Sequence, residues 1–350
     1  MTSQRKAGAI LGYLNIIVKN LVNLIYTPML LSFVGQADYG VYQTSNSFVF
    51  SLTLLTFGFS EAYVRFYTQR NAHGTEDDIR SLNGMYLMLY LAVCAVALSL
   101  GLLFAANVET FFSGSFTSGQ VGLAGELMAI MAVNVACTLF STVFDAYIIA
   151  HEQFKYQQTR QMFTTLATPG IAFLLLCAGM GAVGVATAQL SVTVILLLLN
   201  ARFAYFRLGM RFSFKRFDTA LFRAIASFSA WIFVNQVCDL INQSVPNMML
   251  GALTSAVTVS VFAVSLQIRQ VFYSLSTTMS SVFVPKINRI VAESNDNDVL
   301  TRLMTRVGRY QMFLFCWVYC GFVLLGRFFI TKWAGAGFID AYYLICAMTL

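Results

Sequence analysis

Residues 82–106 read LNGMYLMLYLAVCAVALSLGLLFAA and contain no charged side chain. A helix of about 20 apolar residues crosses the hydrocarbon core of a bilayer, so this stretch predicts a transmembrane helix. Similar apolar runs recur along the whole chain. We expect spans near 7–34, 41–66, 82–106, 121–150, 161–180, 183–206, 221–250, 257–284 and 303–328, with an incomplete tenth from 341 on. The sequence therefore predicts an all-α polytopic membrane protein with about ten transmembrane helices.

The composition supports a membrane protein. Of the 350 residues, 58% are hydrophobic and only 11% are charged, against about 25% charged in a typical soluble domain. In a soluble protein, the net charge of +7 would suggest binding to nucleic acid. Here the basic residues instead concentrate in the segments that we expect on the cytoplasmic side of the membrane. With the N-terminus in the cytoplasm, only Arg327 and Lys332 fall in outer segments, as the positive-inside rule requires. We expect a multi-pass protein of the bacterial inner membrane, with a cytoplasmic N-terminus, the lipid bilayer as a partner and no nucleic acid.

Polar side chains recur at every fourth position in the first and seventh spans, so each set forms a stripe along one helix face. The stripes are Asn15, Lys19, Asn23 and Thr27, and Asn235, Asp239, Gln243 and Asn247. Each member of the second stripe lies 220 residues after its counterpart in the first. The second stripe lies six spans after the first, and an even offset preserves orientation, which predicts two parallel repeats. Because polar stripes avoid lipid, we expect both to line a shared central space.

This repeat also predicts the domain organisation. We expect an N-terminal six-helix lobe over 1–206, a cytoplasmic linker over 207–220, and a C-terminal lobe over 221–350 that is incomplete. No outer loop is long enough for a catalytic domain, so we expect no enzyme activity. His73 and His151 each lack a second ligand at metal spacing, and we expect no metal or cofactor.

Two cations fall inside predicted spans and are candidates for substrate contact. Lys19 lies about 18–20 Å along its helix from Lys6, near mid-membrane. It either binds an anionic group or is neutralised by Asp239. Arg269 is flanked by Gln267 and shares a helix face with Tyr273. Its guanidinium either binds a phosphate in a bidentate manner or holds its lobe together through hydrogen bonds between helices.

Other charges have a structural interpretation. Glu61 and Arg65 are spaced i, i+4 near the inner end of the second span, which predicts a structural or gate-forming ion pair. Glu126 and Asp145 lie near the two ends of the fourth span, where both can reach the membrane interface.

Several segments resemble the Wzx-like polysaccharide and O-antigen flippase family of the multidrug/oligosaccharidyl-lipid/polysaccharide exporter superfamily. The resemblance covers essentially the whole chain and is carried by ADYGVYQ at 37–43, GFSEAYVRF at 58–66, AHEQFKY at 150–156 and the unit from NMMLG at 247–251 to VFAVSLQ at 261–267. It implies a 6+6 helix architecture with a central cavity and alternating access. It also implies that an undecaprenyl-pyrophosphate-linked oligosaccharide moves from the inner to the outer leaflet, with proton or sodium coupling left open. Relatives often carry an acidic residue where this chain has Asn247.

Two other functions compete with this interpretation. Multidrug or cation-coupled exporters of the same superfamily resemble one another in having an acid in the first span, where this chain has Lys19, but Asp239 keeps that alternative open. A membrane glycan polymerase or glycosyltransferase would need paired acids in a sizeable outer loop. The outer acids Asp38, Glu109 and Asp340 are isolated from one another.

Overall fold

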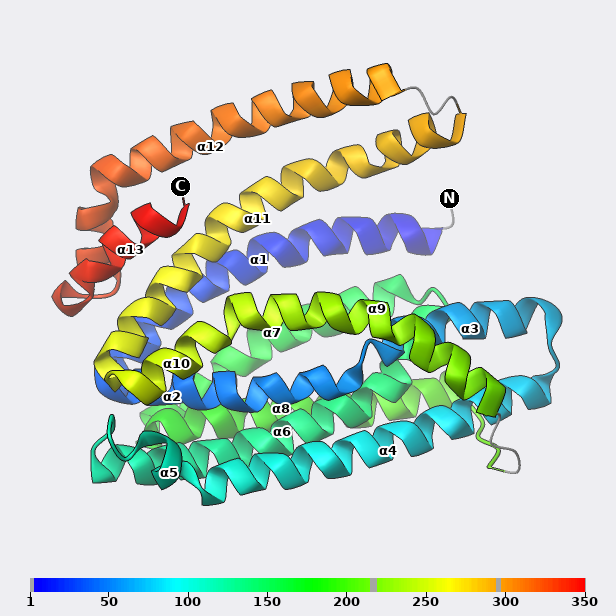
Figure 1. Ribbon diagram of the computed structural model, residues 1–350, viewed down its shortest axis with the longest axis horizontal. Helices are drawn as coiled ribbons and strands as arrows, with labels where there is room; N and C mark the ends of the chain where they lie inside the picture. Colours follow the sequence, from blue (N-terminus) through cyan, green and yellow to red (C-terminus); the bar gives the residue numbers. More distant parts are fainter. Residues whose placement is uncertain (1–2, 215–218, 294–296, 350) are drawn as a thin grey trace. The chain divides into compact units, whose positions relative to one another are not determined.

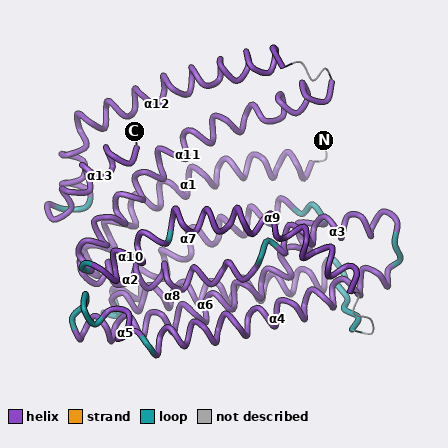
Figure 2. Tube along the Cα trace, viewed as in Figure 1, coloured by secondary structure: helices purple, strands orange, loops and turns teal. Residues whose placement is uncertain are grey.

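The computed structural model describes residues 3–214, 219–293 and 297–349 (Figure 1). Within these ranges the chain is helical and contains no strand (Figure 2), as the sequence predicts. The chain divides into two compact units, Met1–Val259 and Ser260–Leu350. The elements that begin in the first unit are α1 (Ser3–Val34), α2 (Gln36–Phe50), the 3-10 helix η1 (Ser51–Thr56), α3 (Phe59–His73), α4 (Glu76–Ala106), α5 (Val108–Phe112), α6 (Ser118–Ala150), α7 (Phe154–Cys177), α8 (Gly181–Arg202), the π-helix η2 (Phe203–Arg207), α9 (Thr219–Gln243), α10 (Val245–Leu253) and α11 (Ala256–Glu293). The remaining elements are α12 (Asn297–Trp333), the 3-10 helix η3 (Ala336–Phe338) and α13 (Ile339–Thr349).

Among the residues that the structure describes, eight helical segments are long and apolar enough to cross a membrane. They are Leu14–Val34, Gln36–Asn71, Glu76–Ala106, Ser118–Ala150, Gly181–Arg207, Phe222–Gln243, Ala256–Ser274 and Asp298–Trp333. A shorter apolar helix, Ala336–Thr349, includes the start of the expected incomplete span. The expected span 161–180 forms most of α7 but is not among the eight, because polar residues such as Lys155 and Arg160 fill the first half of that helix.

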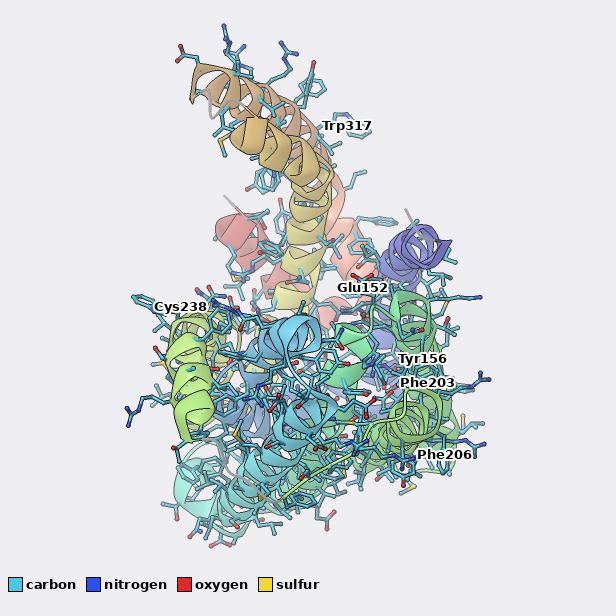
Figure 3. All side chains as sticks on the ribbon, turned by 90° about the vertical axis from the view of Figure 1, so that its right-hand side faces the viewer. Glu152, Tyr156, Phe203, Phe206, Cys238 and Trp317 are labelled. Atoms are coloured by element: carbon cyan, nitrogen blue, oxygen red, sulfur yellow. The ribbon has the colours of Figure 1, made fainter. Side chains whose placement is uncertain are left out.

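The first unit is a bundle with an apolar exterior. In it, α4, α6 and α8 lie side by side, and α1 packs against α7 (Figure 1). Large apolar side chains point outward from the bundle, for example Phe206, which is 76% exposed (Figure 3). Tyr156 of α7 instead stacks on Phe203, with ring centroids 3.9 Å apart. An apolar exterior over polar interior contacts is the pattern that a bilayer favours.

The expected span 41–66 is interrupted near its middle. After η1, Phe57 and Gly58 adopt left-handed backbone conformations with φ of 47° and 67°. A bulky residue rarely adopts a positive φ, so neighbouring side chains must hold this break in place. The Phe57 ring packs on Phe233 of α9, with centroids 4.6 Å apart.

The expected span 221–250 is also divided. Helix α9 ends at Gln243, and α10 begins at Val245 with Pro246 in its first turn. Proline lacks a backbone N–H, so it is tolerated in the first turn of a helix and disrupts a helix interior. Helix α1 nevertheless continues past Pro28 to Val34.

Backbones approach closely where α2 meets α10 and the first turn of α11. A Cβ atom built on Gly40 would overlap the carbonyl group of Ala256, and one on Gly251 would meet the side chain of Thr44. Nearby, the hydroxyl of Ser115 donates a hydrogen bond to the carbonyl of Ala252 at 2.6 Å. Small residues let membrane helices pack at such short range.

The predicted repeat and its lobe boundary stay predictions, with two observations beside them. Helices α2 and α11 begin at Gln36 and Ala256, and these starts are separated by the same 220 residues as the two polar stripes. The unit boundary after Val259 lies beyond the expected linker at 207–220, because α9 packs on α3 and α10 on α2. The first part of that linker is also held in unit 1, where the Ser213 N–H donates to the Arg80 carbonyl at 2.9 Å. Residues 215–218 of the linker lie outside the described residues.

The second unit is held by hydrogen bonds from aromatic hydroxyls. Tyr319 donates to the carbonyl of Cys346 at 3.0 Å, and Tyr342 donates to that of Val323 at 2.9 Å. Both bonds join α12 to α13. They satisfy polar groups within the unit, as a bilayer environment requires.

We expect Gly40→Ala to destabilise the protein by about 1–3 kcal/mol, because the new methyl group overlaps backbone that cannot rotate away. Gly122→Ala is the matched control: this helical glycine has open space around it, and the change should be neutral or stabilising by up to about 1 kcal/mol. Thermal unfolding of the purified proteins in detergent measures both effects. Equal unfolding temperatures for the two variants would show that the α2–α11 contact is looser than described.

Candidate functional site

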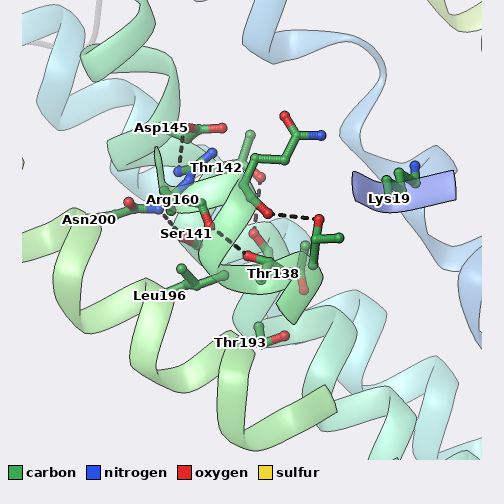
Figure 4. A pocket seen from close by; sticks show the side chains of 12 residues that line it. Lys19, Thr138, Ser141, Thr142, Asp145, Arg160, Thr193, Leu196 and Asn200 are labelled. Carbon is green, nitrogen blue, oxygen red and sulfur yellow. Dashed lines mark hydrogen bonds and ion pairs between the residues drawn. The ribbon is translucent and has the colours of Figure 1, made fainter. Parts of the chain in front are cut away.

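A polar cavity of about 510 Å³ lies in the first unit between α1, α6, α7 and α8 (Figure 4). It is lined by Lys19, Thr138, Ser141, Thr142, Asp145, Arg160, Gln161, Thr164, Thr165, Thr193, Leu196 and Asn200. All but one of these residues are polar, in a chain that is 58% hydrophobic. Its volume falls in the range of roughly 300–1,000 Å³ that small-molecule sites occupy. Because polar groups in membrane helices face a wet or protein interior, this cavity is the candidate site.

The polar half of α7 forms one wall of this cavity and is tied to α1. Asn15 is 5% exposed, and its Nδ2 atom donates to the carbonyl and to the Oε1 atom of Gln158, both at 2.8 Å. In this structure the Asn15 amide therefore connects two helices instead of lining the cavity. The connection holds α1, and with it Lys19, against α7.

An ion pair spans the cavity wall between α6 and α7. Arg160 Nη1 lies 2.6 Å from Asp145 Oδ1, and the two side chains are 17% and 26% exposed. Asp145 is partly buried against Arg160, a residue that the sequence placed in an inner loop, and its expected position near the membrane interface stays a prediction. The pair is neutral as a unit, so it does not set the net charge of the cavity.

Lys19 brings the remaining charge to the cavity. It stands on α1, apart from the group of Asp145, Arg160 and Thr142 (Figure 4). Within the part of the chain that the structure describes, no carboxylate lies at ion-pair distance from its ammonium. The described cavity therefore carries one uncompensated positive charge.

Asp239 lines a second cavity, of about 300 Å³, in the same unit. Gln236 and Gln243 of α9 line it together with Thr53 and Thr56 of η1. Lys19 and Asp239 therefore face different spaces, and no ion pair joins them among the described residues. The proposed neutralisation of Lys19 by Asp239 does not occur in this structure.

Other predicted site residues occupy varied positions. Asn23 and Asn235 are exposed on α1 and α9. Gln267, Arg269 and Tyr273 belong to the second unit, where Arg269 and Gln267 are partly buried and Tyr273 is exposed. Their assignment to the substrate stays a prediction.

The expected Glu61–Arg65 ion pair is not among the ion pairs of the described residues. The guanidinium of Arg65 instead lies over the ring of Phe228 in α9, 4.6 Å from the ring centroid. Such a contact is worth roughly 0.5–1 kcal/mol at an exposed position. Arg65 thus connects α3 to α9 and does not pair with Glu61 in this structure.

Sequence reasoning missed the hydroxyl groups of the cavity. Thr138 and Thr142 are four residues apart, and so are Ser141 and Asp145, which places these two pairs side by side on one face of α6. The same spacing argument identifies the stripe around Lys19. A search for hydroxyl stripes as well as amide and charged ones would have found this wall.

The sequence matches the family of polysaccharide biosynthesis proteins over residues 6–291. No curated protein sequence matches it. Solved structures that share its fold include the following three. The lipid II flippase MurJ in an inward closed conformation has a TM-score of 0.77 and 14% identity, covering 97% of this chain and 72% of that chain. An inward-facing multidrug resistance MATE family transporter of the MOP superfamily has a TM-score of 0.70 and 13% identity, covering 95% and 76%. The MATE multidrug transporter DinF-BH has a TM-score of 0.66 and 13% identity, covering 99% and 80%.

The apolar helices of the described residues define a multi-pass membrane protein, whose fold is shared with a lipid II flippase and with a transporter of the MOP superfamily. Within that class, the chain belongs to the polysaccharide biosynthesis protein family, since the family match covers most of its length. The family resemblance seen in the sequence is confirmed.

We expect Asp145→Asn to destabilise the protein by about 1–3 kcal/mol, because it leaves the Arg160 charge partly buried without a counter-ion. The double variant Asp145→Asn with Arg160→Gln removes both charges and should recover much of that loss. Arg80→Gln breaks an exposed pair with Glu76 and should cost less than about 1 kcal/mol. Thermal unfolding in detergent tests the series. A double variant no more stable than Asp145→Asn would show that the ion pair is not the source of the loss.

Proposed function

We propose that this protein carries an undecaprenyl-pyrophosphate-linked oligosaccharide from the inner to the outer leaflet of the bacterial inner membrane, by alternating access, for export of a polysaccharide such as O-antigen. The observation that carries the proposal is the uncompensated ammonium of Lys19 in a polar cavity of the first unit. Membership of the polysaccharide biosynthesis family supports it. So does the fold shared with a lipid II flippase.

Electrostatics explains why such a substrate needs this cavity. A pyrophosphate is anionic, and moving an isolated charge from water into hydrocarbon is prohibitively costly. A cavity that contains water, hydroxyl groups and one unpaired cation lowers that cost. The Asp145–Arg160 pair adds polarity without cancelling the Lys19 charge. An anion is therefore attracted to this cavity and a cation is repelled from it.

The other predicted site residues join this proposal as contacts of the substrate path. Arg269 on α11 supplies a second cation, with a fork suited to a phosphate group, beside Gln267 and Tyr273. Asn23, Asn235 and Gln243 supply polar contacts on α1 and α9. We place the N-terminus in the cytoplasm, on the basis of the Lys and Arg distribution.

A multidrug or cation-coupled exporter is the second candidate function. Asp239, which lines the cavity beside η1, favours it because a carboxylate attracts a cationic drug, a proton or a sodium ion. The fold shared with two MATE multidrug transporters is also consistent with this second function. The two functions differ in which charge matters: Lys19 for an anionic lipid head group, Asp239 for a cation.

We expect Lys19→Gln to reduce surface polysaccharide by about tenfold or more, because a charge-assisted contact with the pyrophosphate is lost. Lys19→Arg keeps the charge and should retain more export. Lys155→Gln, at an exposed lysine of α7 outside the cavity, is the matched control and should export normally. Surface polysaccharide is quantified on cells that produce equal amounts of inserted protein.

A double variant tests the neutralisation hypothesis for the same lysine. Since Lys19 and Asp239 line different cavities, Lys19→Asn with Asp239→Asn should export no better than Lys19→Asn alone. Recovery of export in the double variant would contradict a substrate contact at Lys19. Normal export by Lys19→Gln, with drug resistance lost in Asp239→Asn, would favour the multidrug exporter.

A further inference from the structure

Four of the five threonines that line the cavity donate their hydroxyl hydrogen to a backbone carbonyl of their own helix. Thr138 donates to the carbonyl of Asn134 at 2.8 Å, and Thr142 donates to that of Thr138 at 3.0 Å. On α7, Thr164 and Thr165 also donate to the carbonyl four residues earlier, at 3.1 Å and 2.9 Å respectively. A hydroxyl has a single hydrogen to donate, so each of these four oxygens can offer the cavity only its lone pairs.

A further acceptor lies in the same wall. Asn200, which is 1% exposed, donates its Nδ2 hydrogen to Ser141 Oγ at 3.0 Å, while its buried Oδ1 has no hydrogen-bond partner among the described residues. Carboxylate oxygens of Asp145 are acceptors as well. These acceptors lie on the side of the cavity formed by α6, α7 and α8, next to Gln161 and to Arg160, whose charge is paired with Asp145. We call Thr138, Thr142, Thr164 and Thr165 the acceptor wall.

An acceptor wall discriminates between the two parts of a glycosylated pyrophosphate. Fully ionised phosphate oxygens have no hydrogen to donate, and their negative charge is repelled by neighbouring acceptors. Sugar hydroxyl groups and acetamido N–H groups can donate hydrogen bonds to these lone pairs. Lys19, which stands apart from the wall on α1, has three N–H donors and a positive charge suited to the anion (Figure 4).

We propose that the acceptor wall is a subsite for an uncharged sugar ring, read through its hydroxyl or amide donors, while the anion next to that sugar stays on the Lys19 side. The inference rests on the proposed function and specifies the substrate class at the same cavity. The subsite favours a neutral or N-acetylated sugar adjoining the pyrophosphate. A uronic acid in that position is disfavoured, because its carboxylate would face the threonine oxygens.

Threonines in helices commonly donate to the carbonyl four residues earlier, so the back-bonding itself does not single out the wall. Thr187 of α8 does so at 2.8 Å and does not line the cavity. It therefore provides a matched control. Threonine to valine keeps the side-chain shape and removes the oxygen, whereas threonine to serine keeps the oxygen.

The test measures binding of two probes to the purified full-length chain in nanodiscs by calorimetry. One probe is geranyl pyrophosphate, and the other is the same pyrophosphate esterified to N-acetylglucosamine. The parent protein should bind the sugar-bearing probe more tightly. Thr142→Val with Thr165→Val should lose about tenfold of that advantage, with binding of geranyl pyrophosphate unchanged. The corresponding double serine variant and Thr187→Val should keep the advantage.

The outcomes separate the subsite from the proposed function. If geranyl pyrophosphate binding depends on Lys19 but the sugar adds no affinity, or if the double valine variant keeps the advantage, the subsite is refuted and the proposed function stands. Absence of binding by either probe to the parent would refute both. Equal loss for both probes in the double valine variant would show a general disturbance of the cavity and would also overturn the subsite.

Discussion

The cost of a polar group in hydrocarbon governs the organisation of this protein. A buried charge or unpaired amide inside a bilayer must find a partner or reach water. In the first unit, the Asn15 Nδ2 atom donates to Gln158, and the Asp145 carboxylate pairs with Arg160. These contacts bring the polar half of α7 against α1 and α6. The cavity lies between the helices that they join, so the interactions that solve the burial problem also shape the site.

Much of the fold could be predicted because transmembrane helices leave a simple signal. Long uncharged runs such as 82–106 predict the helical class and most of the span positions. The interruptions were missed. A break at Phe57 and Gly58 depends on packing against α9, a contact distant in sequence. In the sequence, helix α7 resembles an ordinary span because its second half is apolar. Its polar first half faces the cavity, which the sequence alone does not indicate.

The candidate site was only partly predictable. Lys19 could be identified from the sequence because a lone charge in an apolar helix is costly wherever it lies. Its neighbours could not, since Arg160 looks like one more basic residue of an inner loop. Only the packing of α7 on α6 places it 2.6 Å from Asp145. The sequence predicts that the Asp239 stripe lines the same space as Lys19; in the structure Asp239 and Gln243 line a cavity beside η1, and Lys19 is not among the residues of that cavity.

We propose that the protein moves a lipid-linked glycan between leaflets through a cavity that attracts its anionic head. Proteoliposomes test it most directly, with a fluorescent undecaprenyl-pyrophosphate-linked sugar and a membrane-impermeant quencher added outside. The parent protein should expose the inner-leaflet probe to the quencher, Lys19→Gln should not, and a fluorescent phospholipid should stay protected with both. A lipid-linked sugar that remains protected in vesicles containing the parent protein, or a phospholipid moved equally well, would refute a specific lipid-linked glycan flippase.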